Sequence, residues 1–126
     1  MPKKICLLLV EDEEEFASMV KARLEGNGYE VLTAGDGARG LELAKQKKPD
    51  LILLDQLMPV MDGYTTLSKL KEFPGTRAIP VIIFSAKAQP EDLRRARELG
   101  ACDYIVKPFE PNALFERIGK ALALPI

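Results

Sequence analysis

Five short runs of apolar residues alternate along the chain with longer segments in which apolar residues recur every three or four positions. Runs of this length between turn-forming residues are typical of strands, and the longer spacing is typical of amphipathic helices. We therefore predict five strands, each followed by a helix. The runs cover residues 5–10, 29–34, 51–55, 80–85 and 103–107.

The helical pattern is clearest after the first and the last run. It consists of Phe16, Met19, Val20 and Leu24, and then of Leu114, Ile118, Ala121 and Leu122. Residues suited to helix ends are Gly26 and Gly100 as left-handed terminators, Asp36 as a cap, and Pro90 and Pro111 in first turns. The predicted helix at 90–99 has the thinnest apolar stripe and is expected to be loosely held.

The first, third and fourth runs are almost uninterrupted Leu, Ile and Val, as expected for central parallel strands that are buried on both faces. The second and fifth runs carry more polar residues and suit the edges of the sheet. The alternation of strands and helices predicts a three-layer α/β fold with helices on both faces. The 126 residues fit a single domain over 1–126, with a core of about 4–122 and no linker or repeat.

The amino-acid composition limits the kinds of catalysis and metal binding that the chain can perform. Lys+Arg number 18 and Asp+Glu 19, with 47% hydrophobic residues, which is typical of a globular protein and not of a disordered or nucleic-acid-coating one. The chain contains no histidine, which excludes catalysis by an internal imidazole and argues against a zinc site. Any chemistry must therefore use carboxylates, hydroxyls and lysines.

The two cysteines, Cys6 and Cys102, form neither a disulfide framework nor a CxxC metal motif. The first apolar run is followed at once by acidic residues and is too short for a signal peptide or a membrane span. We expect a cytoplasmic protein that is not inserted in a membrane.

Polar side chains follow four of the predicted strands: Glu11 and Asp12, Asp55, Ser85, and Lys107. In a parallel sheet these strand ends share one edge, where open α/β folds place their ligand crevice. Each residue alone also fits an ordinary structural role, such as a helix-end charge, a turn cap or an exposed cation. Their joint occurrence favours a common site.

Three carboxylates within ~4 Å of one another would repel by roughly 4 kcal/mol per pair, so they must protonate, separate or bind a cation. An acid-rich oxygen site selects Mg²⁺, with Mn²⁺ as a substitute, and would accept a phosphoryl group. Asp55 is the candidate nucleophile and Ser85 a hydrogen-bond donor to the phosphoryl group. An aspartyl-phosphate hydrolase is a weaker alternative, because Leu57 stands where a second acid would be needed. A flavin-binding flavodoxin is disfavoured because residues 11–15 would repel a phosphate.

Four segments resemble the receiver domain of bacterial two-component response regulators, including the single-domain chemotaxis receivers, over about 4–122. They are LLLVEDEEEF, LILLDQLMPVMDGY, IPVIIFSAKA and GACDYIVKPF. The resemblance implies a flavodoxin-like doubly wound sheet of order 2-1-3-4-5 with five helices. It also implies that Asp55 is phosphorylated and that Lys107 contacts the phosphoryl group. Mg²⁺ would be bound directly by Asp12, through water by Glu11, and by Asp55 and the Leu57 carbonyl. Ser85 and Tyr104 would be the paired switch residues.

The same resemblance makes Leu57 and Lys87 the positions that tune the lifetime of the phosphoryl group. An apolar Leu57 cannot orient an attacking water, so we predict slow autodephosphorylation. A cis Lys107-Pro108 bond is also implied. In the order 2-1-3-4-5 the first and fifth strands lie roughly 14 Å apart, beyond the reach of a disulfide, so Cys6 and Cys102 should remain thiols.

These features predict a phosphorylation-activated signalling switch and not a turnover enzyme. The phosphoryl donor would be a phosphohistidine of a sensor histidine kinase or phosphotransfer protein, since the chain has no histidine of its own. Phosphorylation would draw Ser85 toward the phosphoryl group and turn Tyr104 inward, changing the surface of 90–99, 103–107 and 111–122 for a downstream protein. A free-standing receiver, one cut from a DNA-binding or enzymatic regulator, and a phosphorylation-dependent homodimer all remain open. Because 123–126 follow the last helix without a recognition helix or basic tail, we expect no direct nucleic-acid binding.

Overall fold

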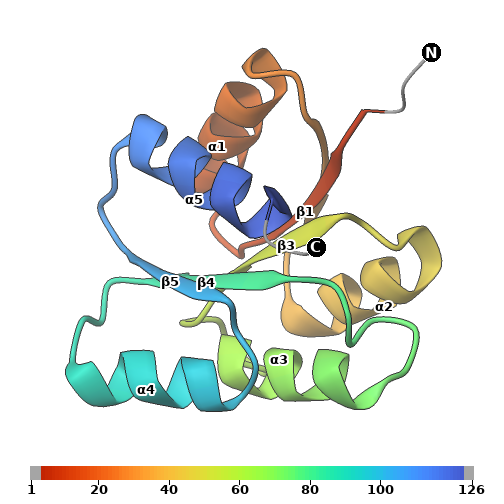
Figure 1. Ribbon diagram of the computed structural model, residues 1–126, viewed down its shortest axis with the longest axis vertical. Helices are drawn as coiled ribbons and strands as arrows, with labels where there is room; N and C mark the ends of the chain where they lie inside the picture. Colours follow the sequence, from red (N-terminus) through yellow and green to blue (C-terminus); the bar gives the residue numbers. More distant parts are fainter. Residues whose placement is uncertain (1–3, 124–126) are drawn as a thin grey trace.

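The computed structural model describes residues 4–123 as five strands and five helices in strict alternation (Figure 1). The strands are β1 Cys6–Val10, β2 Glu30–Ala34, β3 Leu51–Asp55, β4 Val81–Ser85 and β5 Asp103–Val106. The helices are α1 Glu14–Gly26, α2 Gly37–Lys47, α3 Gly63–Glu72, α4 Pro90–Glu98 and α5 Pro111–Ala123. The prediction that no basic tail follows the last helix falls on 124–126, which lie outside the described residues.

All five strands are parallel and lie in the order β2-β1-β3-β4-β5. Helices α1 and α5 cover one face of the sheet, and α2, α3 and α4 cover the other (Figure 1). The predicted α/β class, strand order and edge strands are therefore confirmed. The order agrees with the sequence pattern, because the three strands of nearly continuous Leu, Ile and Val occupy the centre.

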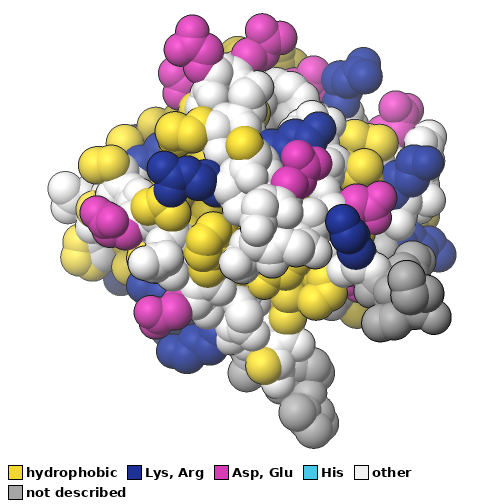
Figure 2. All heavy atoms as spheres, turned by 90° about the horizontal axis from the view of Figure 1, so that it is seen from above, with side chains coloured by type: hydrophobic (Ala, Val, Ile, Leu, Met, Phe, Trp, Pro, Cys, Tyr) yellow, Lys and Arg dark blue, Asp and Glu magenta, His cyan; other side chains and the backbone are white. Residues whose placement is uncertain are grey.

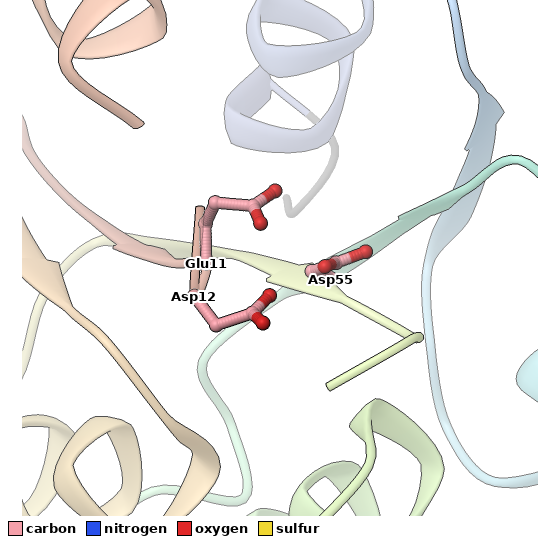
Figure 3. A group of neighbouring side chains, drawn as sticks. All are labelled: Glu11, Asp12 and Asp55. Carbon is pink, nitrogen blue, oxygen red and sulfur yellow. The ribbon is translucent and has the colours of Figure 1, made fainter. Parts of the chain in front are cut away.

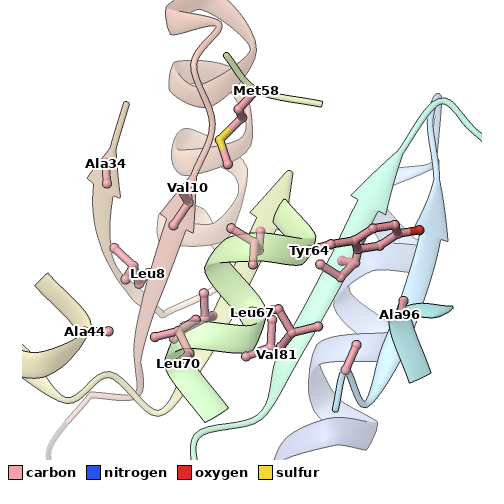
Figure 4. Close-up of a cluster of buried hydrophobic side chains, with 14 of the residues drawn as sticks. Leu8, Val10, Ala34, Ala44, Met58, Tyr64, Leu67, Leu70, Val81 and Ala96 are labelled. Carbon is pink, nitrogen blue, oxygen red and sulfur yellow. The ribbon is translucent and has the colours of Figure 1, made fainter. Parts of the chain in front are cut away.

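Two apolar cores form because side chains of a strand point alternately to opposite faces. Leu8 and Ile52 point to the α2, α3 and α4 side, where Leu67 of α3 packs over them, while Leu7 and Leu9 point to the α1 and α5 side. Figure 4 shows the first of these cores, with the leucines of α3 directed toward the strands. The central strands are thus buried on both faces and hold the strand ends rigidly at one edge.

Most helix ends agree with the sequence. The Asp36 carboxylate caps α2 by accepting a hydrogen bond from Arg39 N at 2.8 Å, and Gly100 after α4 is left-handed with φ of 109°. The prediction for Gly26 is wrong: it is the last residue of α1, and the left-handed turn falls at Gly28, because the chain makes two further helical-type backbone bonds before it reverses.

Other departures concern single residues. Met19 is 52% exposed, because the stripe of α1 that faces the sheet runs through Ala17, Val20 and Leu24 instead. Helix α4 buries only Ala96, in agreement with a loosely held helix. Several predicted segments differ from the observed ones by one residue at an end. The first predicted strand, for example, includes Ile5, which is exposed and precedes β1.

Three smaller expectations are also tested by the structure. Cys6 and Cys102 are not joined by a disulfide, as the separation of β1 and β5 requires. The Lys107-Pro108 bond is cis. Within residues 4–123, no helix combines the length and apolar character that crossing a membrane needs.

Candidate functional site

Three carboxylates meet where β1 and β3 end (Figure 3). Asp55 is the last residue of β3, and Glu11 and Asp12 directly follow β1. One oxygen from each residue lies within 4.8 Å of the others. Glu11 and Asp55 are each only 3% exposed, whereas Asp12 is open to solvent. The cluster is therefore a half-covered acidic pocket with one accessible side.

Lys107 supplies the positive charge of this pocket. It follows β5, and its backbone N–H donates to the Ser85 carbonyl at 2.8 Å. Its Nζ lies 3.1 Å from Glu11 Oε1 and 3.6 Å from Asp55 Oδ1, so the ion pair with Glu11 is the closer one. The structure thus brings together the acidic residues and the lysine that the sequence places at the ends of separate strands.

Burial raises the pKa of two carboxyl groups in the pocket, those of Glu11 and Asp55. Desolvation raises the pKa of Glu11 to about 7, with the neighbouring Asp55 charge adding to the rise and the Glu13 N–H and Lys107 opposing it. Desolvation also raises the pKa of Asp55, against the attraction of Lys107. One lysine therefore does not neutralise the site. Carboxylate oxygens are the donors that hard divalent cations prefer, so the residues present fit such an ion.

The loop between β3 and α3 is fixed to the end of β3 by close backbone packing. Gln56, which sequence reasoning missed, is buried, and its Oε1 accepts a hydrogen bond from Tyr64 N at 2.8 Å. A Cβ at Gly63 would lie 2.5 Å from the Asp55 carbonyl oxygen, so only glycine fits there. The side chain of Leu57, in contrast, is about half exposed. No sequence pattern distinguishes Gln56 from a solvent-exposed loop amide.

The two candidate switch residues bind the backbone of the same residue, Lys87. Ser85 is fully buried, and its Oγ accepts a hydrogen bond from Lys87 N at 3.1 Å. The Tyr104 hydroxyl donates to the Lys87 carbonyl at 3.0 Å. Tyr104 is only 9% exposed, so its ring lies inward. The inward turn of Tyr104 on phosphorylation stays a prediction.

A second tyrosine, also missed from the sequence, connects α3 to α4. The hydroxyl of Tyr64 donates to the carbonyl of Asp92, in the first turn of α4, at 2.9 Å. Burial raises the pKa of Tyr64 to about 12, and Arg95 stacks over its ring at 5.5 Å. A hydroxyl partner that stands 28 residues away leaves no local signal in the sequence.

Comparison with known proteins agrees with this geometry. Residues 7–119 match the response regulator receiver domain family. The chain is 42% identical to the response regulator PleD of Caulobacter vibrioides over 89% of its length, but spans only 25% of PleD. It is 39% identical to the transcriptional regulator PhoP of Bacillus subtilis over 94% of its length, and spans 48% of PhoP. It is 38% identical to PilH of Pseudomonas aeruginosa, of which it spans 97%, against 93% of this chain.

Solved structures give the same answer. Chemotaxis protein CheY4 of Vibrio cholerae superposes with a TM-score of 0.91 at 30% identity, covering 95% of this chain and all of the other. The receiver domain of the sensor histidine kinase PA1611 from Pseudomonas aeruginosa, solved with a magnesium ion coordinated in its active-site cleft, has a TM-score of 0.88 at 29% identity, covering 95% of this chain and 98% of that one. The chain belongs to the response regulator receiver domain family, whose members act as phosphorylation-activated signalling switches.

Proposed function

We propose that this receiver takes up a phosphoryl group on Asp55 from a phosphohistidine of a sensor histidine kinase or histidine phosphotransfer protein. The observation that carries the proposal is the position of Asp55 at the end of β3, where it lies close to two further carboxylates and to Lys107 at one edge of the sheet. As the bond from Asp55 Oδ to phosphorus forms, the bond from phosphorus to the donor imidazole breaks, and the imidazole leaves with the bonding electrons. A carboxylate needs no general base for this attack.

The charge of the pocket supports Mg²⁺ as the ion that accompanies the reaction, with Mn²⁺ as a substitute. Glu11, Asp12 and Asp55 would hold it together with the backbone carbonyl of Leu57. When bound, the ion would neutralise the phosphoryl oxygens as they approach the acidic pocket. The chain itself must bring the three carboxylates into place, and the raised pKa of Glu11 reflects the cost of burying its charge beside Asp55 without a cation.

Lys107 and Ser85 are proposed to bind the phosphoryl group once it is on Asp55. The ammonium of Lys107 already lies 3.6 Å from Asp55 Oδ1 and only has to exchange Glu11 for a phosphoryl oxygen. The register of β4 on β3 sets Phe84 opposite Asp55, so Ser85 lies one residue beyond the end of β3. Ser85 Oγ accepts a hydrogen bond from Lys87 N and keeps its own proton to donate to a phosphoryl oxygen.

Labelling with a small phosphodonor tests the acceptor directly. Purified protein incubated with ³²P-acetyl phosphate and Mg²⁺ should become labelled, and Asp55→Asn should abolish the label. Asp103→Asn is a matched control, because this aspartate pairs with Arg117 on the surface of β5 away from the pocket. Chelation of divalent cations should prevent labelling of the wild type. Label retained in Asp55→Asn would show a different acceptor and contradict the proposal.

The lifetime of the phosphoryl group is proposed to depend on Leu57 and Lys87. Leu57 presents a half-exposed apolar side chain two residues beyond Asp55, and such a side chain cannot orient an attacking water. We expect slow autodephosphorylation, and Leu57→Asn should accelerate it severalfold. A lifetime of seconds in the wild-type protein with Mg²⁺ would contradict this expectation.

The output surface is proposed to lie on α4, β5 and α5, where a downstream protein or a second phosphorylated copy would dock. Helix α4 buries a single residue and therefore shifts at low cost. The relatives include both PilH, which the chain spans almost completely, and the longer PleD and PhoP. A cytoplasmic receiver, free-standing or joined to an output domain, fits both. A phosphotransfer profile against the candidate kinases of the source organism would identify the donor.

A further inference from the structure

Lys107 is held by aromatic rings as well as by carboxylates. Its Nζ lies 4.4 Å from the centroid of the Phe16 ring and 5.0 Å from that of Phe84. Phe16 reaches the site from α1 and Phe84 from β4. These distances are within the range at which the negative face of an aromatic ring attracts an ammonium.

The two rings belong to a three-ring cluster. Phe16 and Phe84 are 6.0 Å apart between centroids, and Phe109 completes the cluster at 6.0 Å from Phe16 and 6.3 Å from Phe84, edge-on to both. Centroid distances of this size are typical of favourable aromatic pairs. Only Phe16 and Phe84 of the three have the Lys107 ammonium over their faces.

A neutral ring and a carboxylate hold a lysine in different ways. The ion pair with Glu11 at 3.1 Å offsets the lysine charge, and the phosphoryl group must compete with it. A ring attracts the ammonium and leaves its full charge available. Lysine has a flexible four-carbon stem, so without lateral contacts its ammonium would spread over several rotamers whenever Glu11 is engaged elsewhere.

We propose that Phe16 is a positioning residue for phosphoryl transfer, whose ring, together with Phe84, keeps the Lys107 ammonium beside Asp55 before the phosphoryl group arrives. The inference rests on the proposed function of Lys107 as a phosphoryl contact. It assigns Phe16 a role beyond the packing of α1, since the ring that lies in the α1 core also faces the ammonium.

Three variants separate this role from packing. Phe16→Leu removes the ring face and keeps an apolar side chain, Phe16→Tyr keeps the ring, and Phe109→Leu removes a ring of the same cluster that does not lie under Lys107. The maximal rate of labelling by acetyl phosphate at saturating Mg²⁺ should fall about two- to fivefold in Phe16→Leu, the equivalent of one exposed cation–π contact. Phe16→Tyr should retain the wild-type rate. Phe109→Leu should also retain it, although both leucine variants should lower the unfolding midpoint.

A nuclear magnetic resonance measurement tests the contact without phosphorylation. Ring currents should shift the Lys107 ε-methylene protons upfield in the wild type and in Phe16→Tyr, and this shift should shrink in Phe16→Leu. Equal loss of labelling rate in Phe16→Leu and Phe109→Leu, or an unchanged rate in Phe16→Leu, would overturn the proposal. Absence of labelling in the wild type would instead remove the proposed function itself, while the proton shifts would still decide whether Phe16 holds the ammonium.

Discussion

The buried Glu11 should make the metal-free protein less stable as the pH rises. Its pKa is about 7 in the folded chain, against an ordinary value of 4.5, chiefly because burial disfavours the charged carboxylate. A carboxyl group whose pKa is higher in the folded than in the unfolded state binds its proton more tightly when folded. Its contribution to stability is therefore complete below pH ~4.5 and is lost as the pH rises through about 7.

The size of the effect follows from the two pKa values. Over the full range, the rise from 4.5 to about 7 corresponds to about 3 kcal/mol. Between pH 6 and pH 8 the same linkage predicts a loss of about 1 kcal/mol, because much of the titration of Glu11 falls in this window. The pKa of Asp55 is raised for the same reason and contributes with the same sign.

Urea denaturation in the presence of a chelator measures this loss. The free energy of unfolding of the wild type should be about 1 kcal/mol lower at pH 8 than at pH 6, and Glu11→Gln should flatten this dependence. Glu14→Gln is the control, since Glu14 is exposed in the first turn of α1. Mg²⁺ binds the ionised carboxylates, so it should stabilise the wild type more at pH 8 than at pH 6.

The reasoning would be refuted if the wild type gained stability between pH 6 and pH 8 without a divalent cation. It would equally be refuted if Glu11→Gln kept the slope of the wild type while Glu14→Gln behaved normally. In that case Glu11 would ionise as an ordinary glutamate, and the repulsion on which the cation requirement rests would be small.

Three further substitutions have defined outcomes. Val60 is fully exposed at φ of 68°, a conformation that asparagine adopts more readily, so Val60→Asn should raise the unfolding free energy by about 0.5–1 kcal/mol in the same denaturation assay. Gly63→Ala would press a methyl group onto the Asp55 carbonyl, and should destabilise the protein by ~2 kcal/mol and reduce acetyl-phosphate labelling at least tenfold. Tyr64→Phe removes the hydrogen bond to Asp92 and should speed amide hydrogen exchange of α4 by about fivefold, while Tyr29→Phe leaves it unchanged.

The sequence was sufficient for the fold and for the site residues that end strands. Leu51–Asp55 could be predicted to the residue, because an uninterrupted apolar run that stops at a single aspartate is typical of a buried strand reaching the sheet edge. Parallel strands then bring Glu11, Asp55 and Lys107 to the same edge without knowledge of any side-chain conformation. The parallel arrangement of the strands is therefore enough to bring these three residues together, although they are far apart in the sequence.

The contacts that hold the site together could not be predicted, because they depend on side-chain direction within an element. Met19 and Val20 both fit a helical stripe, yet only Val20 faces the sheet, since the stripe of α1 is centred one residue away. The amide of Gln56 and the hydroxyl of Tyr64 are polar groups in apolar surroundings, and their partners are chosen by three-dimensional proximity. Sequence spacing contains no information about these bonds.

The hydrogen bonds at Lys87 connect the two proposed switch residues to one loop. The Tyr104 hydroxyl donates to the Lys87 carbonyl, and the Lys87 N–H donates to Ser85 Oγ. If Ser85 donates its proton to a phosphoryl group on Asp55, as we propose, its Oγ keeps the lone pairs that accept from Lys87 N, so the two residues can stay bonded while Ser85 moves. A shift of Ser85 toward Asp55 would therefore draw the Lys87 backbone with it. Helix α4 begins three residues later and buries only Ala96, so it is the element that such a shift would displace at low cost.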